Sequence, residues 1–375
     1  MFGTAIKKTA ILGLLAAGTT GALAAQEELR PSGTWNVPTC NRVVGTAAVT
    51  YTTDEGATLT PTTQPLTGVS YTAGLVALDT PNKLLAAVNS TILRSNNAGC
   101  LWSRVADLGP QAGNEILTLT AGAGERAFIW SDNRSLLFRY DGGTITRLRG
   151  TGTSIVGLAV DGRNGDRIRL GDDIGQIWES IDGGDSFQPV GAPAVQPGYW
   201  AYRVAFAPSN LDHAVVGTVV SGALVTFDGG RNWTQSAGIS KGSANVFNIV
   251  VSPADPSVVW AMGLDLAIAD TDPSHGRFIY HSMDGGLTFA PRIPEDGFVK
   301  LINGPVMAAH PTNPDVLYFI FGSSFQGYGT DLFRFDAAAG QLTVNHNAYH
   351  GIKAIEFSPA SPSVMYLGLI SEQIH

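Results

Sequence analysis

The sequence has little charge and very little cysteine. Only 14% of its 375 residues are charged and it holds 2 cysteines, whereas 44% are hydrophobic. This composition excludes a disordered polymer, a collagen, a coiled coil and a miniprotein built on several disulfides, and it suits an ordinary globular core. Acidic residues outnumber basic ones by 31 to 23, which gives a net charge of −8. Without a basic excess, binding to nucleic acid is not expected.

Beyond the N-terminal region, no apolar run approaches the roughly 20 residues that a membrane span needs. At the N-terminus, Lys7 and Lys8 precede an apolar stretch at 10–17 and a small-residue site at 22–24. This order predicts a signal peptide at 1–24, followed by a tail at 25–42. A membrane anchor is the alternative, but glycines and threonines interrupt a segment that is already short. We expect the mature chain to be soluble, acidic and secreted, either to a periplasm or to the medium.

The two cysteines, Cys40 and Cys100, both follow the predicted signal peptide. An oxidising location outside the cytoplasm allows them to form a disulfide, and two separate buried thiols are the alternative. Neither cysteine has a second one at the spacing of a zinc motif, so they do not predict a metal site.

Short internal repeats carry most of the information. The octapeptides at 180–187, 226–233 and 282–289 share a Ser or Thr, an Asp two residues later, two positions taken by Gly and a final aromatic residue. With looser and eroded copies, the Asp or Asn of this Asp repeat occurs seven times, at 54, 97, 141, 182, 228, 284 and 336. The spacing is close to that of the four-stranded units of β-propellers.

A second repeat alternates with the first. It combines Pro with Ser, Asn or Asp at 206–210, 251–256, 310–314 and 357–362, and weaker versions bring the number to seven. Both repeats are turn signals, the Pro repeat between the first two strands of a unit and the Asp repeat between the last two. Four short strands cannot bury both faces of their sheet alone, so the units must stack around an axis.

The order of the repeats predicts how the ring closes. The chain opens with an Asp repeat that lacks its Pro repeat and ends with a Pro repeat that lacks its Asp repeat. We therefore predict an all-β, seven-bladed β-propeller over 43–375, made of four-stranded antiparallel blades, in which 43–64 and 351–375 share the closing blade. The strands expected in that blade are 44–52, 58–62, 352–357 and 364–370. A bridge between Cys40 and Cys100 would pin this closure.

The Asp repeat resembles the Asp box, or bacterial neuraminidase repeat, of sialidases, xyloglucanases, sortilin-type receptors and photosystem-assembly propellers. In those proteins the Asp boxes are peripheral turns that lie far from the functional face. The resemblance therefore implies a structural role for the matching residues, which are Asp54, Asn97, Asp182, Asp228 and Asp284, with the aromatic residues Trp102, Phe187, Trp233 and Phe289.

Function is expected on the opposite face, around the central channel. There, the loops that enter the innermost strands meet the joins between second and third strands. These loops are rich in aromatic side chains, which offer a large contact area to a protein or sugar at low entropic cost. The predicted binding residues are Tyr199, Trp200, Tyr202, Phe247, Phe325, Tyr328, Tyr349 and His350. Alternatively, some of the aromatic side chains fold back and seal the mouth of the channel.

The sequence contains no convincing catalytic motif. A sialidase needs an arginine triad, a Tyr–Glu pair and a Phe-Arg-Ile-Pro segment, which only 291–294 echoes, after an Asp repeat. Other glycosidases use two facing carboxylates, but no spacing selects a pair among the loop acids. These candidates are Glu115, Asp172, Asp173, Asp265, Asp270, Asp272 and Glu295. His346 and His350 stand four residues apart in a loop-like stretch, where no helix aligns them as metal ligands. No metal or cofactor is therefore predicted.

The resemblance extends to secreted bacterial propellers of the dispase autolysis-inducing family, which act on an extracellular thermolysin-type metalloprotease. It implies a monomeric, non-enzymatic binding module for an extracellular protein or glycan, without insertion into a membrane. The main alternative is a glycoside hydrolase or carbohydrate-binding propeller of the sialidase or xyloglucanase type, which would use Trp200, Tyr202, Asp173 or Glu115. A scaffold that binds a partner domain during envelope assembly is a third hypothesis.

Overall fold

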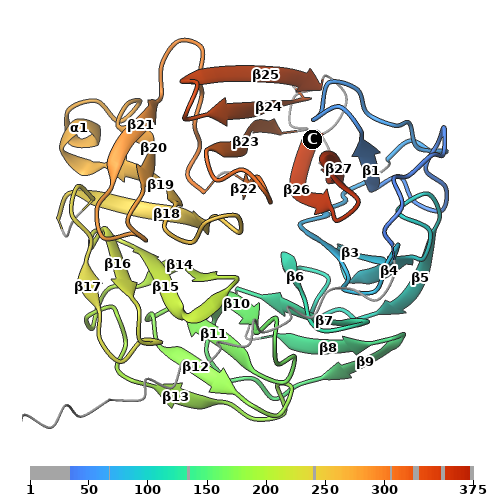
Figure 1. Cartoon of the computed structure of the whole chain (residues 1–375), viewed down its shortest axis with the longest axis horizontal. Coiled ribbons are helices and arrows are strands. Elements are labelled where there is room, and N and C mark those ends of the chain that lie inside the picture. The colour runs from blue at the N-terminus through green and yellow to red at the C-terminus, as the bar shows by residue number, and fades with distance from the viewer. Residues whose placement is uncertain are drawn as a thin grey trace, which may run out of the picture.

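The computed structural model describes residues 34–66, 68–132, 136–239, 242–304, 306–323, 329–347 and 351–371. Over these ranges the chain forms seven antiparallel sheets that stand like blades around a common axis (Figure 1). The predicted seven-bladed β-propeller is confirmed. The signal peptide predicted at 1–24 lies outside the described residues.

Six blades have four strands each, which follow one another in chain order from the channel to the rim. The first two comprise β2 (Gly74–Ala77), β3 (Leu84–Val88), β4 (Thr91–Ser95) and β5 (Trp102–Asp107), then β6 (Leu117–Ala121), β7 (Arg126–Ser131), β8 (Leu137–Asp141) and β9 (Thr144–Arg147). The next two comprise β10 (Ile155–Val160), β11 (Ile168–Asp172), β12 (Ile177–Ser180) and β13 (Gln188–Val190), then β14 (Ala201–Ala207), β15 (Asn210–Thr218), β16 (Ala223–Thr226) and β17 (Thr234–Gln235). The last two comprise β18 (Ala244–Val251), β19 (Val259–Asp265), β20 (Arg277–Ser282) and β21 (Ala290–Pro294), then β22 (Met307–Ala309), β23 (Val316–Ser323), β24 (Gly329–Asp336) and β25 (Gln341–Asn347). A short helix, α1 (Leu266–Thr271), lies in the join between β19 and β20.

The closing blade unites the two ends of the chain, as predicted. Its strands are β1 (Val49–Thr52), β27 (Ser361–Ile370) and β26 (Gly351–Ser358), in that order.

The fourth strand predicted for this blade, at 58–62, is wrong. Thr60 donates one backbone hydrogen bond to Tyr51 of β1, at 2.9 Å, but the segment does not continue the sheet. Pro61 has no N–H to give to a ladder. Its carbonyl and the N–H of Thr63 bond instead to Val43, so the segment is drawn to the chain that precedes β1.

Apolar layers fill the spaces between neighbouring blades. One of them joins Trp260 and Ile279 of one blade to Phe319 and Phe333 of the next. The aromatic residues of the Asp repeats contribute to such layers, with Trp102 and Phe289 buried and Phe187 and Trp233 half-buried. Because each layer belongs to two blades, no blade has a core of its own.

Five of the Asp repeats form the same tight turn, called here the Asp turn. Between β16 and β17, the hydroxyl of Thr226 donates to Oδ1 of Asp228 at 2.8 Å and accepts the N–H of Gly230 at 2.9 Å. Asp228 accepts the backbone and side-chain N–H groups of Asn232, and these bonds lower its pKa to about 2. The hydroxyl and glycine bonds recur around Asp54, Asn97, Asp182 and Asp284.

Four of the Asp turns are also held by a side chain of the preceding blade. The carbonyl of Gly229 accepts Nη1 of Arg169 at 3.1 Å, and that of Gly285 lies 2.7 Å from Nε2 of His213. The matching pairs at two further seams are Tyr366 with Ala98 and Arg139 with Gly183. A backbone acceptor in one blade thus satisfies a buried or half-buried donor of its neighbour.

The second glycine of the Asp turn tests how strongly the seams constrain the backbone. Gly230 has a φ of +93°, and a Cβ there would lie 2.7 Å from Cγ1 of Ile177 in the preceding blade. Gly230→Ala should lower the free energy of unfolding by about 2–4 kcal/mol, because left-handed strain and overpacking add. Urea unfolding measures the change. Gly162, exposed with open space around it, is the control, and its change to Ala should stay within about 0.5 kcal/mol. Equal effects of the two substitutions would contradict this account.

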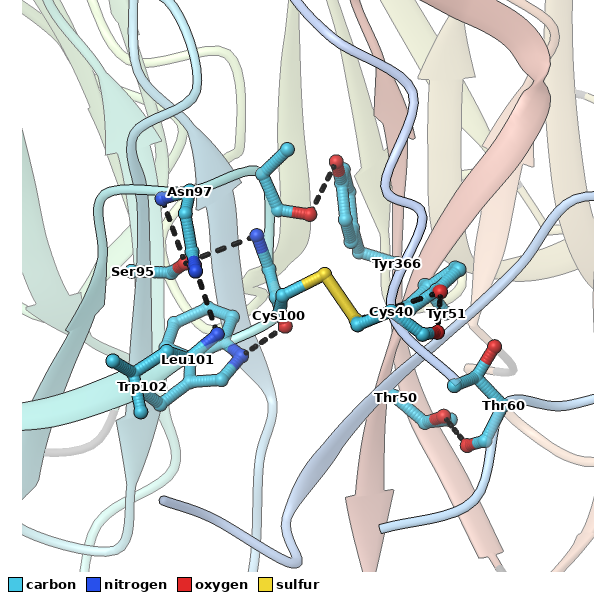
Figure 2. Close-up of a disulfide and its surroundings, with 12 residues drawn as sticks. Cys40, Thr50, Tyr51, Thr60, Ser95, Asn97, Cys100, Leu101, Trp102 and Tyr366 are labelled. Atoms are coloured by element: carbon cyan, nitrogen blue, oxygen red, sulfur yellow. Dashed lines mark hydrogen bonds between the residues drawn. A yellow bond between two sulfur atoms is a disulfide. The ribbon is translucent and has the colours of Figure 1, made fainter. Parts of the chain in front are cut away.

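Cys40 and Cys100 form the disulfide that the sequence allowed, with their Cα atoms 5.8 Å apart. Figure 2 shows that it joins the segment before β1 to the Asp turn of Asn97. Around it, Tyr51 donates to the carbonyl of Cys40, and Tyr366 of β27 donates to Ala98 at 3.1 Å. The bridge therefore crosses the seam between the closing blade and the blade that follows it.

Replacing both cysteines by serine should lower the free energy of unfolding by about 4 kcal/mol, since the bridge closes a loop over 60 residues. Urea unfolding of the oxidised protein, the reduced protein and the double variant provides the comparison. The reduced protein should match the variant. A double variant as stable as the oxidised protein would show that the bridge does not secure the closure.

Candidate functional site

The loops that lead into the innermost strands and the joins between second and third strands share one face, called here the channel face. It lies opposite the Asp turns. Tyr199 and Trp200 precede β14, Tyr202 lies within it, and Phe247 lies in β18 of the next blade. The rings of Tyr202 and Phe247 are 4.8 Å apart, and Trp200 is 51% exposed. Four of the predicted binding residues thus form an aromatic group on two adjacent blades.

The other four predicted binding residues are Phe325, Tyr328, Tyr349 and His350, and all lie outside the described residues. Their place on the channel face stays a prediction.

Several of the acids considered for catalysis are engaged in local structure. Asp172 is fully buried and accepts Nε1 of Trp178 at 2.9 Å, together with two backbone N–H groups. Burial raises the pKa of Asp172, and the hydrogen bonds oppose that change. Asp265 caps the N-terminus of α1, and Glu295 pairs with Arg277 at 3.3 Å. These local contacts give Asp172, Asp265 and Glu295 a structural role that does not require a substrate.

A hollow of about 510 Å³ opens between the blades of β2–β5 and β6–β9, on the channel face. Val69, Tyr71, Asn89, Glu115 and Ile116 are among its lining residues. Val69 and Ile116 are 50% and 43% exposed, so apolar surface is available there. The carboxylate of Glu115 is buried and accepts the hydroxyl of Ser131 at 3.0 Å.

Sequence reasoning missed a contact between two blades that are not neighbours. The guanidinium carbon of Arg203, in β14, lies 5.7 Å from the ring centre of Trp130, in β7. Asp132 follows on the same join, and its pKa is raised by desolvation and by the charge of Glu115, while Arg203 opposes the rise. The available signal was a charged residue inside the otherwise mostly apolar strand β14.

Within the described ranges, no three His, Cys, Asp or Glu side chains gather closely enough to hold a metal ion. Nor does this part of the chain contain a helix long and apolar enough to pass through a bilayer.

Comparison with known sequences identifies the family to which the chain belongs. No family model matches it. A curated protein of Streptomyces mobaraensis, the dispase autolysis-inducing protein, is 48% identical over 357 residues, which cover 94% of each chain. The chain belongs to the dispase autolysis-inducing protein family. This membership confirms the predicted resemblance to propellers of the dispase autolysis-inducing family.

Solved structures share the fold of this family member at much lower identity. YCF48 bound to D1 peptide is 12% identical with a TM-score of 0.54, over 82% of this chain and 95% of that one. The GH74 xyloglucanase of Xanthomonas campestris is 18% identical with a TM-score of 0.53, over 76% and 48%. The GH74 enzyme of Niastella koreensis is 16% identical with a TM-score of 0.59, over 84% and 53%. At such identities the likeness concerns the fold alone.

The structural role of Asp172 in this family member can be measured. Asp172→Ala leaves the indole N–H of Trp178 and the backbone amides of Ile174 and Gln176 without their acceptor, and should lower the free energy of unfolding by about 3 kcal/mol. Asp270, exposed in α1, serves as the control, and its change to Ala should stay within about 0.5 kcal/mol. An Asp172 variant as stable as the unchanged protein would return this carboxylate to the candidates for function.

Proposed function

We propose that this protein is an exported, non-enzymatic binding propeller whose channel face engages an extracellular protein, with a metalloprotease as the expected partner. The observation that carries the proposal is 48% identity, over 94% of the chain, to a protein named for inducing the autolysis of dispase. The disulfide between Cys40 and Cys100 supports export, because such bridges persist in oxidising compartments.

The channel face has the composition of a protein interface. Large aromatic side chains concentrate binding energy at such interfaces, where they give a wide contact area for few rotatable bonds. Trp200 and Tyr199 are 51% and 36% exposed, beside the pair of Tyr202 and Phe247. We place the centre of the proposed interface on this group, with the hollow near Glu115 at its far side.

Binding to purified dispase tests the proposal. The mature chain should bind the protease and shorten the time over which intact dispase persists. Trp200→Ala should weaken binding by at least about tenfold, since an exposed Trp at the centre of an interface is a typical hot spot. Biolayer interferometry measures the affinity, and gel electrophoresis of timed samples measures the rate of autolysis.

Ile181→Ala is the matched control. Ile181 is 74% exposed and belongs to an Asp turn on the opposite face, so its loss should leave binding unchanged. Thermal unfolding of both variants checks that the fold is intact. Equal loss of binding in the two variants, or no binding of the mature chain to dispase, would speak against the proposed function.

A glycoside hydrolase is the second candidate, and one observation favours it. Glu115 lines the hollow on the channel face, and its charge reaches the carboxylate of Asp132. Two neighbouring carboxyl groups are what the cleavage of a glycosidic bond requires, although only Glu115 of this pair lines the hollow. Xyloglucan and generic aryl glycosides are the substrates to offer. Turnover that is lost in Glu115→Gln would replace the non-enzymatic proposal. If the protein binds dispase and turns over none of these substrates, the non-enzymatic proposal is retained.

A further inference from the structure

Arg203 contacts a blade that is not the neighbour of its own. It lies near the start of β14, the innermost strand of its blade, at the end that belongs to the channel face. Its guanidinium group lies over Trp130, two blades away along the ring. Gly157 of the blade in between lets β14 come close, since a Cβ there would lie 2.0 Å from the carbonyl of Val204. The close approach of these two strands lets the side chain of Arg203 reach past the blade in between.

Among the residues that the structure describes, no counter-charge contacts the guanidinium group of Arg203. Its Nε is buried without a hydrogen-bond partner, and among the described residues no carboxylate forms an ion pair with it. Asp132 acts on Arg203 only through its charge. Arg169, which is 1% exposed, shows the usual solution, because it forms ion pairs with Glu179 and Asp212. A half-buried cation with a buried, unpaired Nε is unfavourable, so its presence at the proposed binding face points to a ligand that completes it.

The geometry defines the chemistry of that ligand. A guanidinium group has only donors, and stacking on a ring leaves its edge available for two parallel hydrogen bonds to a carboxylate. Tyr202, the neighbour of Arg203 in β14, and Phe247 supply apolar surface close by. We propose that Arg203 binds a carboxylate of the protein partner, either an acidic side chain or a chain terminus, in the channel mouth above Trp130. This inference rests on the proposed function, because it specifies the partner group that the channel face receives.

Peptide titrations of the mature chain test the inference without the protease. Three probes are needed, namely acetyl-Gly-Gly-Glu-Gly-Gly-amide, its Gln counterpart, and acetyl-pentaglycine with a free carboxyl end. Two-dimensional NMR of the side-chain N–H groups follows Arg203 and Trp130. We expect the Glu peptide, the free-carboxyl peptide or both to bind in the millimolar range, and the Gln peptide to bind at least about tenfold more weakly. The carboxylate probe that binds identifies the source of the group.

Variants distinguish recognition of the carboxylate by Arg203 from its general electrostatic attraction to the protein. Arg203→Met should weaken carboxylate binding by at least about tenfold without lowering the thermal stability, because no ion pair is lost. Arg203→Lys keeps the charge but not the planar fork, and serves as a second variant should the first fail to fold. Asp132→Asn should strengthen binding, since it removes a negative charge that competes with the ligand. Arg163→Met, on an exposed site of the opposite face, is the matched control and should change nothing.

Two results would overturn the inference, namely equal binding of the Glu and Gln peptides, or carboxylate binding that survives in both Arg203 variants. If dispase then still binds to the unchanged protein and loses affinity in Trp200→Ala, the proposed function stands and only the role of Arg203 fails. If carboxylates bind at Arg203 but dispase does not bind at all, the proposed partner is wrong and the carboxylate site remains.

Discussion

The ring depends on a hydrogen bond that passes from one blade to the turn of the next. The acceptor is a backbone carbonyl of the Asp turn, while the donor changes from seam to seam between Arg, His and Tyr. A backbone acceptor is available whatever the side chains of the turn are, so the donor can vary without loss of the contact. The turn itself is less tolerant, because its second glycine has a φ near +93° and lies against the preceding blade.

The same kind of hydrogen bond, from one blade to the Asp turn of the next, also secures the blade that contains the two ends of the chain. In the closing blade β1 pairs with β27, and Tyr366 of β27 donates to the Asp turn that carries Cys100. The disulfide links that turn to Cys40, which precedes β1 (Figure 2). A ring whose last sheet contains its first strand leaves that strand paired, and the bridge limits its separation from the following blade. The three-stranded closing blade can therefore do without the fourth strand that the other blades have.

The fold could be predicted because its turn signals are local. A hydroxyl, an Asp and a Gly within five residues make the bonds of the Asp turn, so the sequence pattern is sufficient to predict this turn. The strand expected at 58–62 was wrong because its competitor, Val43, acts through pairing that no repeat encodes. The aromatic group could be assigned to one face, since the order of strands determines where each loop emerges. The contact of Arg203 with Trp130 could not be predicted, because a repeat gives the register within a blade and not which side chains contact a blade farther along the ring.

Arg203 differs from the arginines on the opposite face of the propeller, and this difference supports the proposal that the channel face binds the partner. On the face of the Asp turns, arginines pair with acids of the following blade, as Arg126 does with Asp166 at 2.7 Å and Arg139 with Asp185 at 2.8 Å. On the channel face, Arg203 is without such a pair among the described residues. The seams between blades stabilise the fold and so offset the cost of that unpaired group and of the exposed aromatic rings on the channel face. The join between β19 and β20 on the channel face carries the insertion α1, while the Asp turns keep the blades in place.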